Sequence, residues 1–181
     1  MNSKNIGNSY EREIAKKLSK WFTGNDNELV CWRHVSSGSI GTIRKKKGLS
    51  GNNVDGDFQC LDSTYESFFN KFYMDSKSLT DINLFMINPK NQKSNKLLNE
   101  WKKVVKDADD KIPIMFVKVR DDRSIPEFIM LPDDDVSIPL NIDSFIKYDF
   151  LDMNYNFILI LQDDFFRSNN WEDFVKQIKF Y

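Results

Sequence analysis

Two carboxylates and a lysine lie in β-like runs near the middle of the chain. The first run is residues 54–61, VDGDFQCL, with Asp57, and the second is residues 72–77, FYMDSK, with Asp75 and Lys77. Side chains alternate along a strand, so Asp75 and Lys77 point to the same face. If the two runs pair as a hairpin, Asp57 comes next to them. Two acids can hold a divalent cation while a lysine orients or activates a water, which is the chemistry of a metal-dependent phosphodiesterase.

A simpler interpretation of the same residues is a solvated strand face. The triplet acid-x-Lys is common in a chain with 29% charged residues, and it occurs here at residues 75–77, 100–102 and 109–111. Only the first triplet lies in a β-like run that follows a Gly-Asp strand. The choice between the two interpretations therefore depends on what precedes these strands.

Upstream, residues 8–18 predict the start of an amphipathic helix. Asn8 is a candidate N-cap, and Glu11 stands three residues later, as in a capping box. At 100° per residue, Glu11 lies about 60° from Ile14, on the flank of the apolar stripe. Glu11 can therefore face a sheet edge while the stripe packs on the sheet, and simple capping is compatible with that role. The stripe consists of Tyr10, Ile14, Leu18, Trp21 and Phe22.

A basic loop separates this helix from the carboxylates. Residues 29–35, LVCWRHV, predict a short strand, and residues 36–53 are rich in glycine and serine. Four consecutive cations lie in this loop: Arg44, Lys45, Lys46 and Lys47. A basic loop just before an acidic strand suits a clamp on a phosphate backbone, and a disordered, solubilising loop is the alternative.

The order of these parts resembles the PD-(D/E)XK nuclease superfamily, and most closely its small Holliday-junction-resolvase and phage-endonuclease branch. The matching order is a helix with Glu11, a strand that continues into RHVSSGS, a basic loop, a Gly-Asp strand and an Asp-x-Lys strand. The resemblance covers roughly residues 5–120. Each motif is weak by itself, and the order and spacing make the case.

The resemblance implies specific roles for these residues. Glu11, Asp57 and Asp75 would be ligands of Mg²⁺ or Mn²⁺, the backbone carbonyl of Ser76 would complete the coordination, and Lys77 would be the catalytic lysine. The sequence departs from the family pattern at two positions. Gly56 precedes Asp57 where proline is usual, and Asp75 stands where glutamate is commoner, so the metal must lie nearer the strand. The predicted DNA-binding residues are Arg33, Ser36, Ser37, Arg44, Lys45, Lys46 and Lys47.

Length and composition predict one compact domain. The chain has 181 residues, of which 40% are hydrophobic, and this is enough to bury a substantial core. The expected fold is α/β and restriction-endonuclease-like, with a central mixed β-sheet flanked by helices. Its core would span about residues 5–120, and residues 121–181 would add a strand and a terminal helix. The further predicted elements are a helix at 94–108, strands at 113–119, 127–131 and 157–161, and a helix at 171–180.

Several other function classes are excluded by composition. No apolar run approaches the length of a membrane span, and the N-terminus lacks the apolar segment of a signal peptide. Cys31 and Cys60 stand in apolar strand contexts, which indicates buried, reduced thiols of an intracellular, cytoplasmic protein. With His34 as the single histidine, a zinc site has too few ligands. The Asn-, Lys-, Asp- and Phe-rich usage hints at an AT-rich genome, such as that of a phage.

Charge is distributed unevenly along the chain. Residues 1–50 contain ten Lys or Arg and four Asp or Glu, whereas residues 121–181 contain five and thirteen. This asymmetry suits one DNA-facing surface and an acidic back, although charges that are close in sequence need not form a patch in space.

The sequence therefore predicts a metal-dependent DNA endonuclease, with Holliday junction resolution as the first expectation. The small size, the lack of a separate recognition domain and the Arg33–Gly38 segment favour it, and by resemblance a resolvase would be a homodimer that cuts two strands symmetrically. One alternative is a less structure-selective phage or restriction-type endonuclease. Another is a non-catalytic DNA-binding or assembly module on the same fold, and an ordinary scaffold without a nucleic-acid role is the last.

Overall fold

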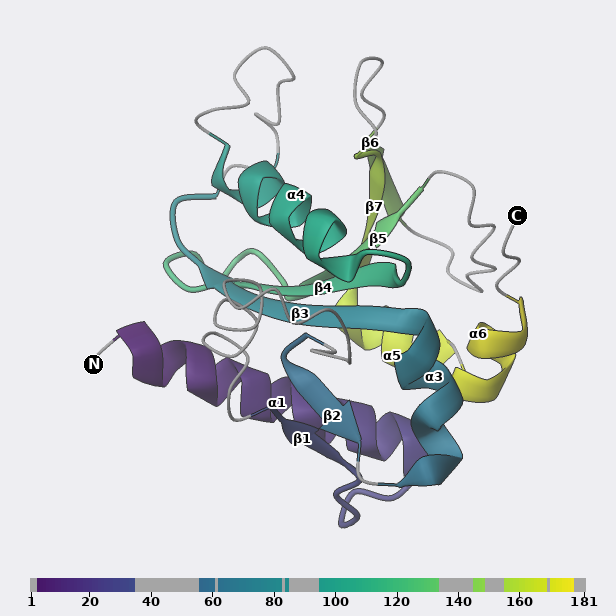
Figure 1. Cartoon of the computed structure of the whole chain (residues 1–181). Coiled ribbons are helices and arrows are strands. Elements are labelled where there is room, and N and C mark those ends of the chain that lie inside the picture. The colour runs from purple at the N-terminus through teal and green to yellow at the C-terminus, as the bar shows by residue number, and fades with distance from the viewer. Residues whose placement is uncertain are drawn as a thin grey trace, which may run out of the picture.

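The protein is an α/β structure built on a five-stranded mixed sheet, as the computed structural model shows (Figure 1). The structure describes residues 3–34, 56–60, 62–82, 84, 95–133, 145–148, 155–168 and 170–177. Its helices are α1 (Ser3–Thr23), η1 (Ser63–Tyr65), α3 (Glu66–Lys71), α4 (Lys96–Ala108), α5 (Gln162–Ser168) and α6 (Trp171–Gln177). Its strands are β1 (Cys31–Arg33), β2 (Phe58–Cys60), β3 (Phe72–Leu79), β4 (Ile112–Val119), β5 (Phe128–Pro132), β6 (Phe145–Tyr148) and β7 (Phe157–Leu161).

The main sheet has the strand order β3-β4-β5-β7-β6. Strands β3 and β4 are parallel and are joined through α4, whereas the other neighbouring pairs are antiparallel. Strands β1 and β2 form a separate antiparallel pair. Helix α4 covers one face of the main sheet, and α1, α3, α5 and α6 lie on the other side (Figure 1). This arrangement confirms the predicted fold class, a central mixed sheet flanked by helices.

The two faces of β3 enter two different cores. Phe72 and Met74 belong to the cluster that also contains Ile14 of α1. Tyr73 and Leu79 belong to the cluster that contains Trp101 of α4. The alternation along β3 thus determines that its even-numbered side chains face α1 and its odd-numbered side chains face α4.

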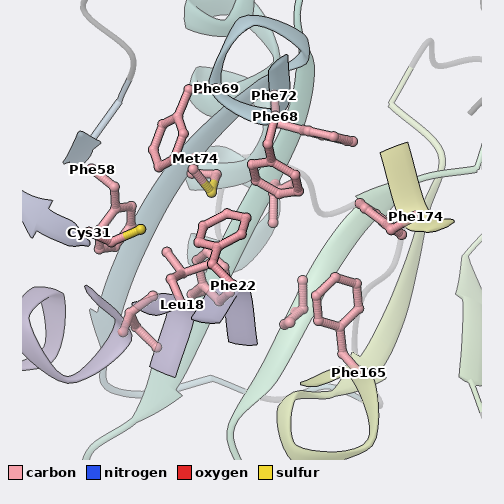
Figure 2. Close-up of a cluster of buried hydrophobic side chains, with 14 of the residues drawn as sticks. Leu18, Phe22, Cys31, Phe58, Phe68, Phe69, Phe72, Met74, Phe165 and Phe174 are labelled. Carbon is pink, nitrogen blue, oxygen red and sulfur yellow. The ribbon is translucent and has the colours of Figure 1, made fainter. Parts of the chain in front are cut away.

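The core beneath α1 is rich in aromatic rings. Phe22, Phe68 and Phe174 come from α1, α3 and α6 and are buried together with the sheet residues Phe72 and Met74 (Figure 2). The predicted stripe of α1 is confirmed, because Tyr10, Ile14, Leu18 and Phe22 are buried and Trp21 packs against the same cluster.

Ion pairs attach the flank of α1 to the sheet. Lys17 of α1 donates to Glu127 at 2.9 Å, and Glu127 also pairs with Lys118 of β4 at 2.6 Å. Lys118 contacts Glu13 of α1 at 3.1 Å. Because these groups link α1 to β4 and to the residue before β5, they resist rotation of the helix about its axis.

Three local predictions are wrong. Helix α1 begins at Ser3, so Asn8 lies inside the helix and is not its N-cap. Among the described residues of the 54–61 run, Phe58–Cys60 form the strand β2, and Asp57 lies in a turn, so the strand is not continuous through Asp57. Strands β2 and β3 do not form a hairpin: β2 pairs with β1, and residues 63–71 form η1 and α3. The helical connection brings the chain into β3 parallel to Gly56, whereas a hairpin needs antiparallel strands.

Within the described residues, no helix is both long and apolar enough to cross a membrane. Cys31 and Cys60 are both free thiols, but only Cys31 is buried as the sequence predicts, and Cys60 is half-buried.

Candidate active site

The candidate site lies on β3, one of the two outer strands of the sheet that the described residues form. Asp75 and Lys77 are on the face of β3 that also presents Tyr73 and Leu79 toward α4. The Lys77 Nζ donates a hydrogen bond to Asp75 Oδ1 at 2.5 Å. The Asp75 side chain is 13% exposed and the Lys77 side chain 27%, so both ends of this ion pair are largely shielded from water.

Asp57 attaches to β3 by three hydrogen bonds. Its backbone N–H donates to the carbonyl of Met74 at 2.8 Å. Its Oδ2 accepts from the backbone N–H of Ser76 at 2.9 Å and from Ser76 Oγ at 3.1 Å. Asp57 therefore lies beside Asp75, as the sequence predicts, although a single parallel bridge brings it there and not a hairpin.

Gly56 makes this close approach possible. Its φ is +79°, and a Cβ on Gly56 would lie 1.9 Å from the Met74 carbonyl oxygen. Proline fixes φ near −65°, so it cannot adopt this backbone conformation. The departure from the family's usual proline at this position thus has a structural reason: the chain passes against the backbone of β3 where only a glycine fits.

The electrostatics of the site follow from two acids close together. Burial and the neighbouring Asp57 carboxylate raise the pKa of Asp75 to about 8, against the opposing effect of Lys77. Burial would by itself lower the pKa of Lys77, but Asp75, Asp57 and Glu100 outweigh it, so this pKa is raised. Two carboxylates that repel each other beside one lysine favour an added positive charge, and oxygen donors of this kind suit a hard divalent cation.

The carbonyl of Ser76 faces the same edge of β3 as the Asp57 carboxylate. The N–H and C=O of one residue point to the same side of a strand. Since the Ser76 N–H donates to Asp57, the Ser76 carbonyl also points away from β4. The two aspartates and this carbonyl therefore provide oxygen donors at one edge of β3.

Glu11 is not gathered with the two aspartates. Its Oε2 accepts from Arg33 Nε of β1, and the two side chains are 14% and 22% exposed. No group of three or more His, Cys, Asp or Glu side chains that could hold a metal occurs among the described residues. A series of contacts nevertheless links Glu11 to Asp57, because Glu11 pairs with Arg33 and the next residue, His34, donates its N–H to the Asp57 carbonyl at 2.7 Å.

One residue near the site was missed by the sequence. Glu100 of α4 acts electrostatically on Lys77, and its side chain is 20% exposed. In the sequence, Glu100 belongs to one of the acid-x-Lys triplets that recur by chance. The predicted helix at residues 94–108 was the available signal. Trp101 of this helix is buried against the face of β3 that presents Asp75 and Lys77, and this contact brings the neighbouring Glu100 near the site.

Only one of the predicted DNA contacts is described by the structure. Arg33 is the last residue of β1, and its side chain lies against Glu11. The remaining predicted contacts lie outside the described residues; these are Ser36, Ser37, Arg44, Lys45, Lys46 and Lys47.

Comparison with known proteins identifies a family that this chain matches. A family model described as "Phage putative PDDEXK endonuclease" matches residues 2–176, which is nearly the whole chain. No curated protein and no solved structure matches. The matched region contains every residue of the candidate site.

Proposed function

We propose a function for this chain from the premise that it belongs to the family of phage PDDEXK endonucleases. Membership of this family makes it a nuclease, with DNA as its substrate. We propose further that Mg²⁺ or Mn²⁺ supports the reaction and that the residues at the open edge of β3 perform it. The observation behind this proposal is the arrangement of Asp57, Asp75, Ser76 and Lys77 at one strand edge.

The residues present fit a divalent cation. Asp57, Asp75 and the Ser76 carbonyl would hold it, and Glu11 would be the third acid. When bound, the cation supplies neutralisation of charge on the phosphate and on the leaving 3′ oxygen. Asp57 is pre-positioned for this task, because its other oxygen and its backbone N–H are already fixed to β3.

Lys77 orients the attacking water in this proposal. Its Nζ already donates to Asp75, which fixes the direction of the side chain. An ammonium group has three donors, so two remain for the water and for a phosphate oxygen. The water then attacks the phosphorus in line with the 3′ oxygen and gives up a proton to solvent, while the bond from phosphorus to the 3′ oxygen breaks and that oxygen takes up a proton from solvent.

The DNA structure that this enzyme prefers is the finer part of the proposal. Holliday junction resolution by a homodimer is the first candidate, because the order of parts from Glu11 to Lys77 resembles the resolvase and phage-endonuclease branch of the superfamily. A less structure-selective endonuclease is the second candidate, and the family description, which names an endonuclease and no junction, favours it.

A labelled cleavage panel tests these proposals. The substrates are a four-way junction, a linear duplex, a nicked or flapped duplex and a single strand, each with Mg²⁺, Mn²⁺ or EDTA. Asp57→Asn and Lys77→Ala are the site variants, and Arg167→Gln on α5 is a matched surface control. We expect cleavage that EDTA and both site variants abolish and that Arg167→Gln preserves.

The pattern of products distinguishes the alternatives. Paired symmetric cuts in the junction alone establish a resolvase. Equal cutting of linear duplex replaces it by a general endonuclease that uses the same site. A folded protein that binds junctions tightly and cuts no substrate in either metal contradicts catalysis and leaves a DNA-binding module.

A further inference from the structure

Glu11 and Arg33 form an ion pair that involves one residue from each half of the proposed mechanism. Glu11 is a predicted metal ligand and Arg33 a predicted DNA contact. The two side chains are joined through Arg33 Nε and Glu11 Oε2, and both are mostly buried. A charged hydrogen bond that is shielded from water is stronger and less screened than one on the surface. While the ion pair is formed, Glu11 therefore does not bind the cation and Arg33 does not bind the DNA phosphate.

The ion pair also accounts for the incomplete set of metal ligands. Asp57 and Asp75 lie together at β3, whereas no third acid joins them among the described residues. The backbone beside Arg33 is fixed to the same place, since His34 donates to the Asp57 carbonyl at 2.7 Å. Arg33 thus ends a strand whose next residue bonds to Asp57, and its side chain contacts Glu11, the acid that is predicted to complete the site.

We propose that Arg33 couples DNA binding to completion of the metal site. In the DNA-free protein the guanidinium holds Glu11. A DNA phosphate, whose geometry matches a guanidinium, takes Arg33, and Glu11 then turns to join Asp57 and Asp75. This inference rests on the proposed function and adds to it the order in which the site is assembled.

The coupling must be reciprocal. If a DNA phosphate frees Glu11 for the cation, the cation must strengthen DNA binding by the same factor. Couplings between two sites typically change affinity by about 5–150-fold. This range sets the size of the effect to be measured.

A double-mutant cycle without DNA isolates the ion pair. Mn²⁺ binding is measured by isothermal titration calorimetry for the unmodified protein, Arg33→Gln, Glu11→Gln and the double variant. We expect Arg33→Gln to bind Mn²⁺ about 5–150-fold more tightly than the unmodified protein. Removing the Arg33 charge also raises cation affinity through general electrostatics, and this part persists in the Glu11→Gln background. The expected result is therefore a gain that is largely absent when Glu11 is glutamine.

A second measurement adds DNA and does not need the Glu11 variants to fold. Lys77→Ala prevents cleavage, and in this variant duplex DNA should tighten Mn²⁺ binding by about 5–150-fold, the coupling range given above. The double variant Lys77→Ala/Arg33→Gln should lose this effect. Arg167→Gln, which removes an exposed arginine paired with Asp164 on α5, is the control and should bind Mn²⁺ like the unmodified protein.

The outcomes separate this inference from the proposed function. Metal binding that Arg33→Gln weakens or leaves unchanged overturns the coupling, because Arg33 would then only orient Glu11 or act elsewhere. The same gain in both Glu11 backgrounds also overturns it. A protein that cleaves DNA with Mg²⁺ yet shows either result keeps the proposed function. A folded protein that binds no Mn²⁺ and cleaves no DNA contradicts both the coupling and the proposed function.

Discussion

Replacing Gly56 by alanine tests whether the close contact with β3 positions Asp57. The new Cβ would lie 1.9 Å from the Met74 carbonyl oxygen and 2.7 Å from its carbonyl carbon. These are backbone atoms of β3, so the clash cannot be relieved by turning a side chain. The segment at residues 56–57 must therefore move away from β3.

The magnitude follows from three contributions. A non-glycine residue at φ +79° costs about 1–2 kcal/mol. Moving the segment also weakens the hydrogen bond from the Asp57 N–H to Met74 and the one from the Ser76 N–H to Asp57, each of which contributes about 0.5–1.5 kcal/mol net. We expect a loss of about 2–5 kcal/mol, or a local detachment that costs less stability and displaces Asp57. In either case cleavage should fall to the level of Asp57→Asn.

Gly24→Ala is the matched control. Gly24 has φ +69° at the end of α1, and a Cβ there would meet no atom within 4 Å. This variant has the backbone cost without the clash, so it should lose about 1 kcal/mol and keep its cleavage activity. For a chain of this size, about 1 kcal/mol corresponds to about 2–4 °C in Tm.

The assay combines thermal melts with single-turnover cleavage of the best substrate at saturating Mg²⁺. Comparing the two alanine variants separates the cost of the backbone conformation from the cost of the clash. If Gly56→Ala melts and cleaves like Gly24→Ala, the contact between Gly56 and Met74 does not position Asp57, and this explanation of the site's geometry is wrong.

Three further predictions follow from other contacts. Burial raises the pKa of Glu127, but Lys118 and Lys17 outweigh this effect and hold the pKa below its usual value, so the pairing stabilises the fold above about pH 4.3 and stops doing so as pH falls through the folded-state pKa. The Tm difference between the unmodified protein and Glu127→Gln should therefore shrink between about pH 5 and pH 3. A Tm difference that stays constant over this range would contradict the pairing. Trp101→Ala should cost about 3–5 kcal/mol in denaturant unfolding, because this ring is fully buried under β3 and β4; a loss below about 1 kcal/mol would contradict that packing. Burial raises the pKa of the Cys31 thiol, so in the folded protein Cys60 should react first with a thiol reagent and Cys31 only on unfolding; equal rates would show that the strand pair opens.

The sequence predicted those parts of the fold in which apolar residues recur at a regular spacing. The α1 stripe and the alternation of β3 are correct because burial of one face requires that spacing. The start of α1 was wrong, because Asn5, Gly7 and Asn8 are weak helix formers that favour a later start. Helix α5 was missed because it follows β7 without a turn residue between them.

The site was predictable in composition but not in geometry. That Asp75 and Lys77 share a face follows from strand alternation alone. The route by which Asp57 reaches them depends on α3, whose Phe68 and Phe69 are buried in the core. Two adjacent phenylalanines do not distinguish a helix from a strand or a loop, so the parallel bridge at Gly56 could not be foreseen. The pairing of Glu11 with Arg33 is likewise a long-range contact without a local pattern.

The position of the site on an outer strand follows from backbone hydrogen bonding. An outer strand presents unpaired N–H and C=O groups, which other chains can use for pairing. In this protein Asp57 lies at that edge: its N–H donates to the Met74 carbonyl, and its carboxylate accepts from the Ser76 N–H. A full partner strand would also have used the Ser76 carbonyl. Because, among the described residues, one residue with its side chain takes the place of a partner strand, Asp57 is held by hydrogen bonds to β3 and the Ser76 carbonyl lies beside it. The contact that limits edge pairing is thus the same contact that builds the proposed site.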